Sequence, residues 1–302
     1  MKELGTYDLD TLEPKGTIFI PGLEEKQRNK IYSDKKTSEE EFNRWIAEKY
    51  GKFYFIFHRV LKKDLKKQYI IRFIYLCIFM NYSGELLYGN AHVQLRKATK
   101  KEIENNIQPP SRYMLEKDLQ EVLKLSRTET IKTKTAFFEK ELIFVNKKGN
   151  LQINDKYCFK GITAYKDKKT SRTRIFENAI RYIYERAKPT EHKKLTLLIT
   201  ILPYINIHNN ILCHNILCDS NFQLNIIDLK ELCRLVEYSE SNKGRLKREL
   251  LDLRVGEEMV IMFNETDTSK SITVNPRIYY GGSIEDFDTL KGVAAYFDLS
   301  NM

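Results

Sequence analysis

One segment of the chain recurs later in the same sequence, and such a repeat constrains the fold more than any single motif does. Residues 80–90 read MNYSGELLYGN, and residues 205–215 read INIHNNILCHN. The matched positions are Asn81 with Asn206, Gly84 with Asn209, Leu86-Leu87 with Ile211-Leu212, and Asn90 with Asn215. An apolar run with helical spacing precedes each segment, at 69–79 and at 195–205. The chain is therefore expected to contain one structural unit twice.

The residues after each segment continue the repeat. A second helix is predicted over 116–126 in the first copy and over 229–239 in the second. Each ends at a serine, Ser126 or Ser239, whose hydroxyl can accept from the free N–H groups of a new helix. The third helices that follow are RTETIKTKTAFFEKE and ESNKGRLKRELLDL. Their spacing predicts that Ile131, Phe137, Phe138, Leu246, Leu250 and Leu251 point inward.

Two strands with a polar tip come after each third helix. The first pair is LIFVNKKGNLQIND at 142–155, and the second is MVIMFNETDTSKSITVN at 259–275. Both pairs close alike, in INDKYCFKG at 153–161 and VNPRIYYGG at 274–282. Three helices and a β-hairpin in this order form a winged helix-turn-helix. The predicted fold class is α+β, mainly α, with two tandem winged helix-turn-helix domains related by internal duplication and an N-terminal extension.

A winged helix places its third helix in the DNA major groove and its wing on flanking phosphates or the minor groove. Arg suits guanine and Asn suits adenine, whereas Lys, Ser and Thr suit phosphates. The alternative is that a mixed-charge helix face is simply solvated. The predicted DNA-binding residues are Arg127, Thr128, Thr130, Lys132, Thr133, Lys134, Ser241, Asn242, Lys243, Arg245, Lys247 and Arg248 on the third helices, with Lys147, Lys148 and Lys270 on the wings.

The closing pattern, an apolar residue and Asn followed by aromatic residues and Gly, is similar to the wing end of RepL-type replication initiators from Gram-positive plasmids. The layout of the first copy also resembles DNA-binding proteins of phages and prophages of those bacteria. Two tandem winged helices are similar to plasmid initiators that clamp repeated DNA sites. The resemblance covers roughly residues 66–162 and returns weakly in 190–283, while the chain is about twice as long as RepL-type proteins. It implies DNA binding in a phage or plasmid setting.

The predicted domain organisation follows the repeat. It consists of an N-terminal extension (1–65), a first winged-helix domain (66–164), a linker with a bridging helix (165–190), a second winged-helix domain (191–283) and a tail (284–302). Ser38 opens a capping-box pattern that predicts a helix to about Lys49. The run FYFIFHRVLKKDLKK (53–67) is predicted as a further helix, and IFENAIRYIYERA (175–187) as the bridging helix.

Charge and composition limit the classes of partner and the compartment that we expect for this chain. The net charge is +10 and the pI about 9.1, which favours nucleic acid first and an acidic protein second. A generally Lys-rich composition would give the same charge. No apolar run approaches the roughly 20 residues of a bilayer span, and MKELGTYDLD lacks the apolar core of a signal peptide. Five cysteines, an odd number, are typical of a reducing cytosol. We therefore expect a cytoplasmic protein that does not enter a membrane.

Candidate chemistry is sparse. His208, Cys213, His214 and Cys218 suggest zinc, but a structural site usually presents two short ligand pairs, and Cys213 is explained as an apolar strand residue. The sequence contains neither a His-x-His pair nor a phosphate-binding Gly-x4-Gly-Lys-Ser/Thr loop. We expect no enzyme activity, no cofactor and no metal.

The sequence leaves three functions open. The first is a sequence-specific double-stranded DNA-binding protein that regulates transcription in a phage or plasmid. The second is a replication initiator that binds origin repeats, and the third is a winged-helix module that docks protein. A homodimer and a phage or host protein partner stay open as well.

Overall fold

The computed structural model describes residues 4–7, 14–18, 38, 40–58, 60, 64–88, 112–161, 172–220, 223–265, 270–282 and 286–299. The chain forms two compact units, Met1–Lys49 and Tyr50–Met302. Helices and small antiparallel sheets make up the described residues, which confirms the predicted α+β class. None of the described helices is long and apolar enough to cross a membrane.

The first unit contains a hairpin and a helical segment. Strands β1 (Leu4–Tyr7) and β2 (Pro14–Ile18) pair antiparallel. Residues 40–50 are helical, in agreement with the helix predicted from the capping pattern at Ser38. Strand β2 includes the first residues of the apolar run GTIFIPG (16–22), a strand-like pattern of which residues 19–22 lie outside the described part.

The centre of the second unit is a four-stranded antiparallel sheet in the order β14-β9-β3-β8. The strands are β3 (Phe53–Phe57), β8 (Cys158–Phe159), β9 (Arg172–Phe176) and β14 (Tyr279–Tyr280). Phe55 faces Arg174 at the middle of the β3–β9 pair, and β8 and β14 add to the two outer edges. The Tyr54 hydroxyl donates to the Ile74 carbonyl at 2.6 Å, which ties the sheet to helix α2 (Lys67–Leu76).

The helix predicted over 53–67 is wrong, because its first five residues form the central strand β3. FYFIF consists of aromatic and β-branched residues, which suit a pleated surface better than a helix. Tyr54 and Ile56 are buried, whereas Phe53 and Phe55 are half-buried, which is the alternation of a strand. Likewise, Arg172 to Arg174 belong to strand β9, not to the basic linker predicted there.

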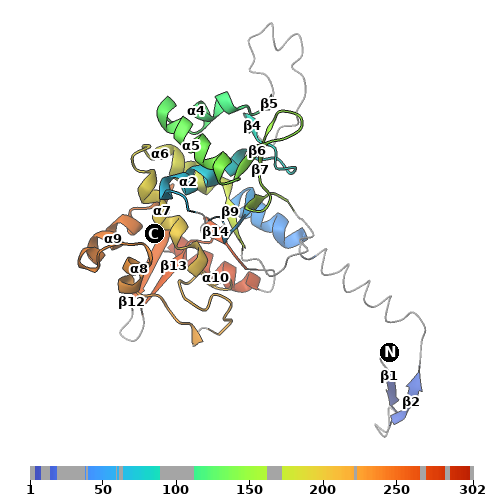
Figure 1. Cartoon of the computed structure of the whole chain (residues 1–302). Coiled ribbons are helices and arrows are strands. Elements are labelled where there is room, and N and C mark those ends of the chain that lie inside the picture. The colour runs from blue at the N-terminus through green and yellow to red at the C-terminus, as the bar shows by residue number, and fades with distance from the viewer. Residues whose placement is uncertain are drawn as a thin grey trace. The chain divides into compact units, whose positions relative to one another are not determined.

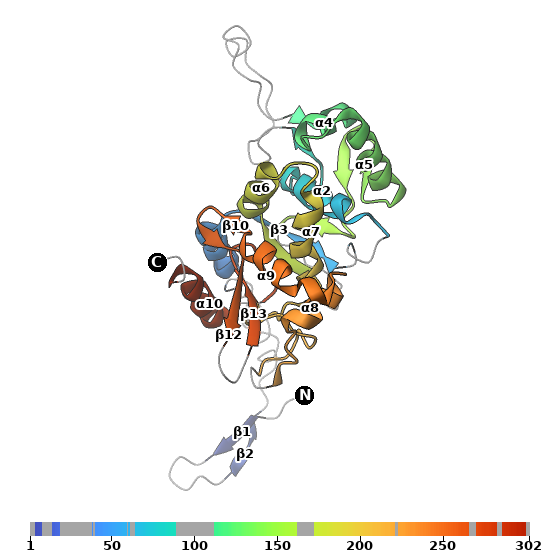
Figure 2. The same cartoon turned by 90° about the vertical axis from the view of Figure 1, so that its left-hand side faces the viewer.

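Two similar sets of elements surround this sheet (Figures 1 and 2). The first set comprises α2, η2 (Cys77–Phe79), β4 (Leu87–Tyr88), β5 (Arg112–Tyr113), η3 (Glu116–Asp118), α4 (Leu119–Val122), α5 (Arg127–Glu139), β6 (Ile143–Val145) and β7 (Leu151–Ile153). The second comprises α7 (His192–Thr200), η4 (Leu202–Tyr204), α8 (Leu229–Leu235), η6 (Glu240–Asn242), α9 (Lys243–Leu251), β12 (Ile261–Glu265) and β13 (Lys270–Val274). The remaining elements are α6 (Glu177–Arg186), the hairpin β10 (Arg254–Val255) and β11 (Glu258–Met259), and α10 (Phe287–Leu299).

Equivalent backbone hydrogen bonds recur in the two sets. Leu86 N donates to Leu151 O at 2.9 Å, and Leu212 N donates to Ile272 O at the same distance. Gly84 and Asn210 occupy equivalent places: the Gly84 carbonyl accepts from Ile153 N, and the Asn210 carbonyl accepts from Val274 N. Both have a positive φ, of 81° and 58°. The matches of Gly84 with Asn209 and of Leu86-Leu87 with Ile211-Leu212 are therefore off by one, because the second turn is one residue longer.

The asparagine that follows each hairpin makes the same bonds in both sets. The Asn154 amide nitrogen donates to the Glu141 carbonyl at 2.8 Å, and that of Asn275 donates to the Met259 carbonyl at 2.9 Å. Their amide oxygens accept from Lys156 N and Arg277 N. Each hairpin needs an asparagine at this place to make these bonds. The same closing pattern therefore occurs in the sequence after both hairpins.

We predict that Asn275→Ala lowers the free energy of unfolding by about 1–3 kcal/mol, because the Met259 carbonyl and the Arg277 N–H lose the side chain that bonds them. Asn275 is 1% exposed, whereas Asn154 is half-buried. Asn154→Ala therefore serves as the matched control and should cost less. Urea unfolding followed by circular dichroism measures both, and an equal or larger loss for Asn154→Ala would contradict the burial argument.

Candidate nucleic-acid interface

A tight turn precedes the third helix of each set. Lys124 (φ 53°) and Glu237 (φ 57°) adopt the left-handed conformation at equivalent places. Leu125 N then donates to Gln120 O at 3.2 Å, and Tyr238 N donates to Cys233 O at 2.7 Å. A single left-handed residue reverses the chain sharply. The second and third helices consequently meet through the same turn in both sets.

The two serines after these turns behave differently. Ser126 caps α5 as predicted, because its hydroxyl accepts from Glu129 N at 3.3 Å. The cap predicted at Ser239 is wrong, since its side chain makes no capping bond and its hydroxyl instead lies 2.7 Å from that of Ser241. The third helical segment of the second set opens with the 3-10 turn η6, so α9 begins several residues after Ser239.

Helix α5 presents only part of the predicted surface. Arg127, Thr128 and Lys132 are exposed, and Lys134 is half-buried and paired with Glu116 at 2.7 Å. The outward placement of Thr130 and Thr133 is wrong: both are buried, and Thr133 is 0% exposed. Ile131, predicted to point inward, is 53% exposed. The helix is therefore rotated relative to the predicted face, with threonines in the core and an isoleucine outside.

Helix α9 and its first turn agree better with the predicted face. Ser241, Asn242, Lys243, Arg245 and Arg248 are exposed, while Leu246 and Leu250 are buried beneath them. Arg245 pairs with Glu249 at 3.0 Å on the same helix, an exposed contact that a DNA phosphate or base can replace. Lys247 is half-buried, pairs with Glu265 at 2.8 Å and lies over the Phe263 ring. Figure 2 shows α5 at the upper right of the molecule and α9 near its centre.

The tips of the hairpins carry the remaining predicted residues. Lys147, Lys148 and Lys270 are all exposed. Residues 266–269 of the second tip lie outside the described part of the chain. The predicted basic side chains are thus accessible at the tips of the two hairpins.

A buried carboxylate shapes the first wing. Glu85 is 8% exposed, and its carboxylate accepts from Asn146 at 2.8 Å and from Asn150 at 3.3 Å. Burial alone would raise the pKa of Glu85, but the hydrogen bonds from Asn150, Asn146 and Asn81 outweigh it and lower the pKa. The side chain is therefore held as a carboxylate that fixes the turn bearing Lys147 and Lys148.

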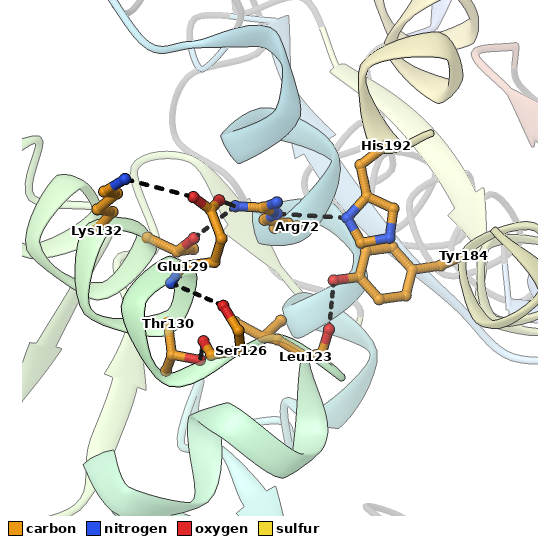
Figure 3. A network of polar contacts seen from close by, with 9 residues as sticks. Arg72, Leu123, Ser126, Glu129, Thr130, Lys132, Tyr184 and His192 are labelled. Atoms are coloured by element: carbon orange, nitrogen blue, oxygen red, sulfur yellow. Dashed lines mark hydrogen bonds and ion pairs between the residues drawn. The ribbon is translucent and has the colours of Figure 1, made fainter. Parts of the chain in front are cut away.

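A polar network under α5 explains its rotated face (Figure 3). Arg72, in the middle of α2, is 2% exposed. Its guanidinium donates to Thr133 at 2.8 Å, to Glu129 at 3.0 Å and to His192 Nδ1 at 3.3 Å. A buried guanidinium requires such partners, so the threonine faces inward to supply one.

The network shifts the ionisation of its members. The hydrogen bond from Arg72 lowers the pKa of Glu129. Burial, reinforced by the positive charge of Arg72, lowers the pKa of His192 from 6.5 to about 4. His192 is therefore neutral at physiological pH, which leaves Nδ1 free to accept from Arg72.

Sequence reasoning did not identify Arg72, His192 or Tyr184. The signal for Arg72 was present, since an arginine interrupts the otherwise apolar run YIIRFIYLCIF. Such a residue in a buried helix needs a counter-charge. Its partners lie far away in the sequence, and nothing local marks them.

The suspected zinc residues have other contacts. His208 pairs with Asp286, and His214 lies 2.7 Å from Glu231. Cys213 is buried, and all five cysteines are free thiols. Within the residues that the structure describes, no group of three or more His, Cys, Asp and Glu side chains could hold a metal ion.

Comparisons with models of known protein families, with curated proteins and with solved structures found no match to this chain.

We predict that the protein loses stability as pH falls from about 6.5 to about 4, because the unfolded chain binds a proton on His192 that the folded chain excludes. A pKa change of this size corresponds to about 3 kcal/mol. His192→Asn should remove this part of the pH dependence, since an amide oxygen can accept from Arg72 without titrating.

Urea unfolding at a series of pH values measures the effect. Identical slopes for wild type and His192→Asn would show that His192 titrates normally.

Proposed function

We propose that this protein binds double-stranded DNA sequence-specifically through two winged helix-turn-helix modules related by duplication, and that it regulates transcription in a phage or plasmid. The observation that carries the proposal is the repeated turn before α5 and before η6 and α9, with equivalent hydrogen bonds in both. The positive net charge of +10 suits a polyanionic partner.

The two modules would read DNA with different side chains. In the first, Arg127, Thr128 and Lys132 are available on α5. In the second, Arg245 and Arg248 are exposed on α9. Arg can bond guanine in bidentate fashion, and Lys adds phosphate contacts. Because the two reading faces differ, the preferred site would not be a palindrome.

The exposed apolar side chains of the first module favour a second candidate function. Ile131 is 53% exposed, and Phe144 and Val145 on β6 are 40% and 46% exposed. In the second module, Gly244 holds the place equivalent to Ile131, one residue after Lys243. An apolar surface beside a recognition helix suits contact with protein better than contact with phosphate. The first module would then dock a protein partner while the second binds DNA.

Fluorescence anisotropy against labelled duplexes that tile the protein's own gene and upstream region tests the proposal. The expected result is tight binding to one tile that persists at higher salt. A promoter tile indicates a regulator, and internal repeats indicate a replication initiator. Weak binding to every tile, lost as salt rises, would reject sequence-specific recognition and favour a protein partner.

On the bound tile, Arg245→Ala and Arg127→Ala should each weaken binding by about 1–3 kcal/mol, because each removes a contact to a base. Arg186→Ala is the matched control, since it removes the same charge from an exposed position on α6. Binding that is unchanged by both substitutions would reject α5 and α9 as recognition helices.

A further inference from the structure

The turn before the third helix of each set accepts a hydrogen bond from an element outside that set, α6 for the first turn and α2 for the second. The carbonyls of Leu123 and Val236 lie at the ends of α4 and α8, immediately before the left-handed turn residues. Terminal carbonyls of a helix lack a partner within the helix. Leu123 O accepts from the Tyr184 hydroxyl of α6 at 2.9 Å, and Val236 O accepts from Lys67 Nζ of α2 at 3.4 Å.

These two contacts are equivalent in place but differ in strength. Tyr184 is 1% exposed, and its hydrogen bond to Leu123 is buried. Lys67 is half-buried, and it also pairs at 2.7 Å with the exposed Glu237. Exposed pairs of this kind contribute little. The turn before α5 is therefore held firmly, and the turn before η6 and α9 only loosely.

One aromatic side chain from the first set and one from the second lie against the Tyr184 ring of α6. Its ring lies parallel to Tyr75 of α2, with 3.8 Å between the centroids, and its other neighbour is His192 of α7 at 4.3 Å. Helix α2 packs along α7. Figure 3 shows Tyr184 and His192 together beside Arg72, with the turn at Leu123 below them.

Arg72 connects His192, which lies against Tyr184, to helix α5. It joins His192 of α7 to Glu129 and Thr133 of α5 through three hydrogen bonds. The first two turns of α5 are thus linked through Arg72 to His192 of the second set, and the turn before α5 is linked to α6 through Tyr184.

The other module lacks this polar link. Leu246 stands on α9 where Thr133 stands on α5, and it is 0% exposed. An apolar contact of this kind would have stabilised α5 as well, without a buried charge. In the first set, α5 is held by directional hydrogen bonds at a position where a non-directional apolar contact would also fit.

We propose that Arg72, Tyr184 and His192 are positioning residues that hold α5 at a fixed distance and angle from the second module, so that the chain selects DNA sites by the spacing of their two half-sites. This inference rests on the proposed function. Each base pair inserted between half-sites turns one of them by about 35° around the duplex axis. A rigid pair of recognition helices cannot follow that turn, whereas a loosely joined pair can.

The distance between the recognition helices tests the rigid link without DNA. Spin labels are placed on Thr128→Cys and Ser241→Cys, both exposed, with the half-buried Cys218 changed to Ser. Double electron–electron resonance on the full chain should give one narrow distance distribution. Tyr184→Phe, which keeps the ring but removes the hydroxyl, and Arg72→Met should each broaden it by about twofold, and Tyr182→Phe, the control on the same helix, should not.

A cooperative thermal unfolding transition shows that each variant is folded. If Arg72→Met does not fold, the distance measurement is made with Tyr184→Phe alone. A broad wild-type distribution would overturn the proposal. So would an unchanged width in a folded Tyr184→Phe protein, because a purely stabilising role lowers the melting temperature without altering the distance.

Binding to DNA then tests the consequence, with unlabelled protein and the tile that wild type binds. Two base pairs inserted between the half-sites should weaken wild-type binding by at least about tenfold, and binding of the Arg72→Met/Tyr184→Phe double variant by less than about threefold. Equal losses in both proteins would overturn the spacing role. A narrow distribution with no binding to any duplex would reject the proposed function and leave the rigid link intact.

Discussion

The antiparallel pairing of β3 with β9 is the interaction on which the rest of the second unit depends. Phe55 faces Arg174 at its centre, and Tyr54–Ile175 and Ile56–Thr173 are the pairs on either side. The two strands are therefore related by a local twofold axis through the central pair. Each strand then accepts the closing strand of its own half on its outer edge. One sheet thereby joins the strands that flank the first set of elements to those that flank the second.

The sequence predicted the parts of this arrangement that local bonds determine. The helix-turn geometry before Ser126 and the side-chain bonds of Asn154 and Asn275 involve neighbours within a few residues or across one hairpin, so their pattern is visible in one segment. Strand β3 was predicted as a helix although its aromatic and β-branched residues suit a strand, and the strand that pairs with it, β9, is distant in the sequence. Short apolar runs do not distinguish a buried strand from a helix on periodicity alone.

The predicted face of α5 failed for a related reason. Periodicity assigns threonine to the surface and isoleucine to the core, and the structure has Thr133 buried and Ile131 exposed. The cause is Arg72, a residue of another helix that needs hydrogen-bond acceptors at that level of the core. A buried guanidinium thus overrides the hydrophobic pattern of the helix packed on it. In α9, where Leu246 fills the equivalent position, the predicted face agrees with the structure.

A buried charge network is weak evidence for stability, because desolvation cancels much of the attraction between its members. Its effect is geometric: the Arg72 guanidinium is planar, and its bonds to α5 and to His192 are directional. An apolar contact would permit α5 to slide and rotate with small changes in energy. Under the proposed function, that freedom would let the first module adapt to several half-site spacings, and the network removes it. The two modules would then have different roles. Helix α9 would supply the more basic surface for reading DNA, and the fixed position of α5 would set the spacing between the half-sites.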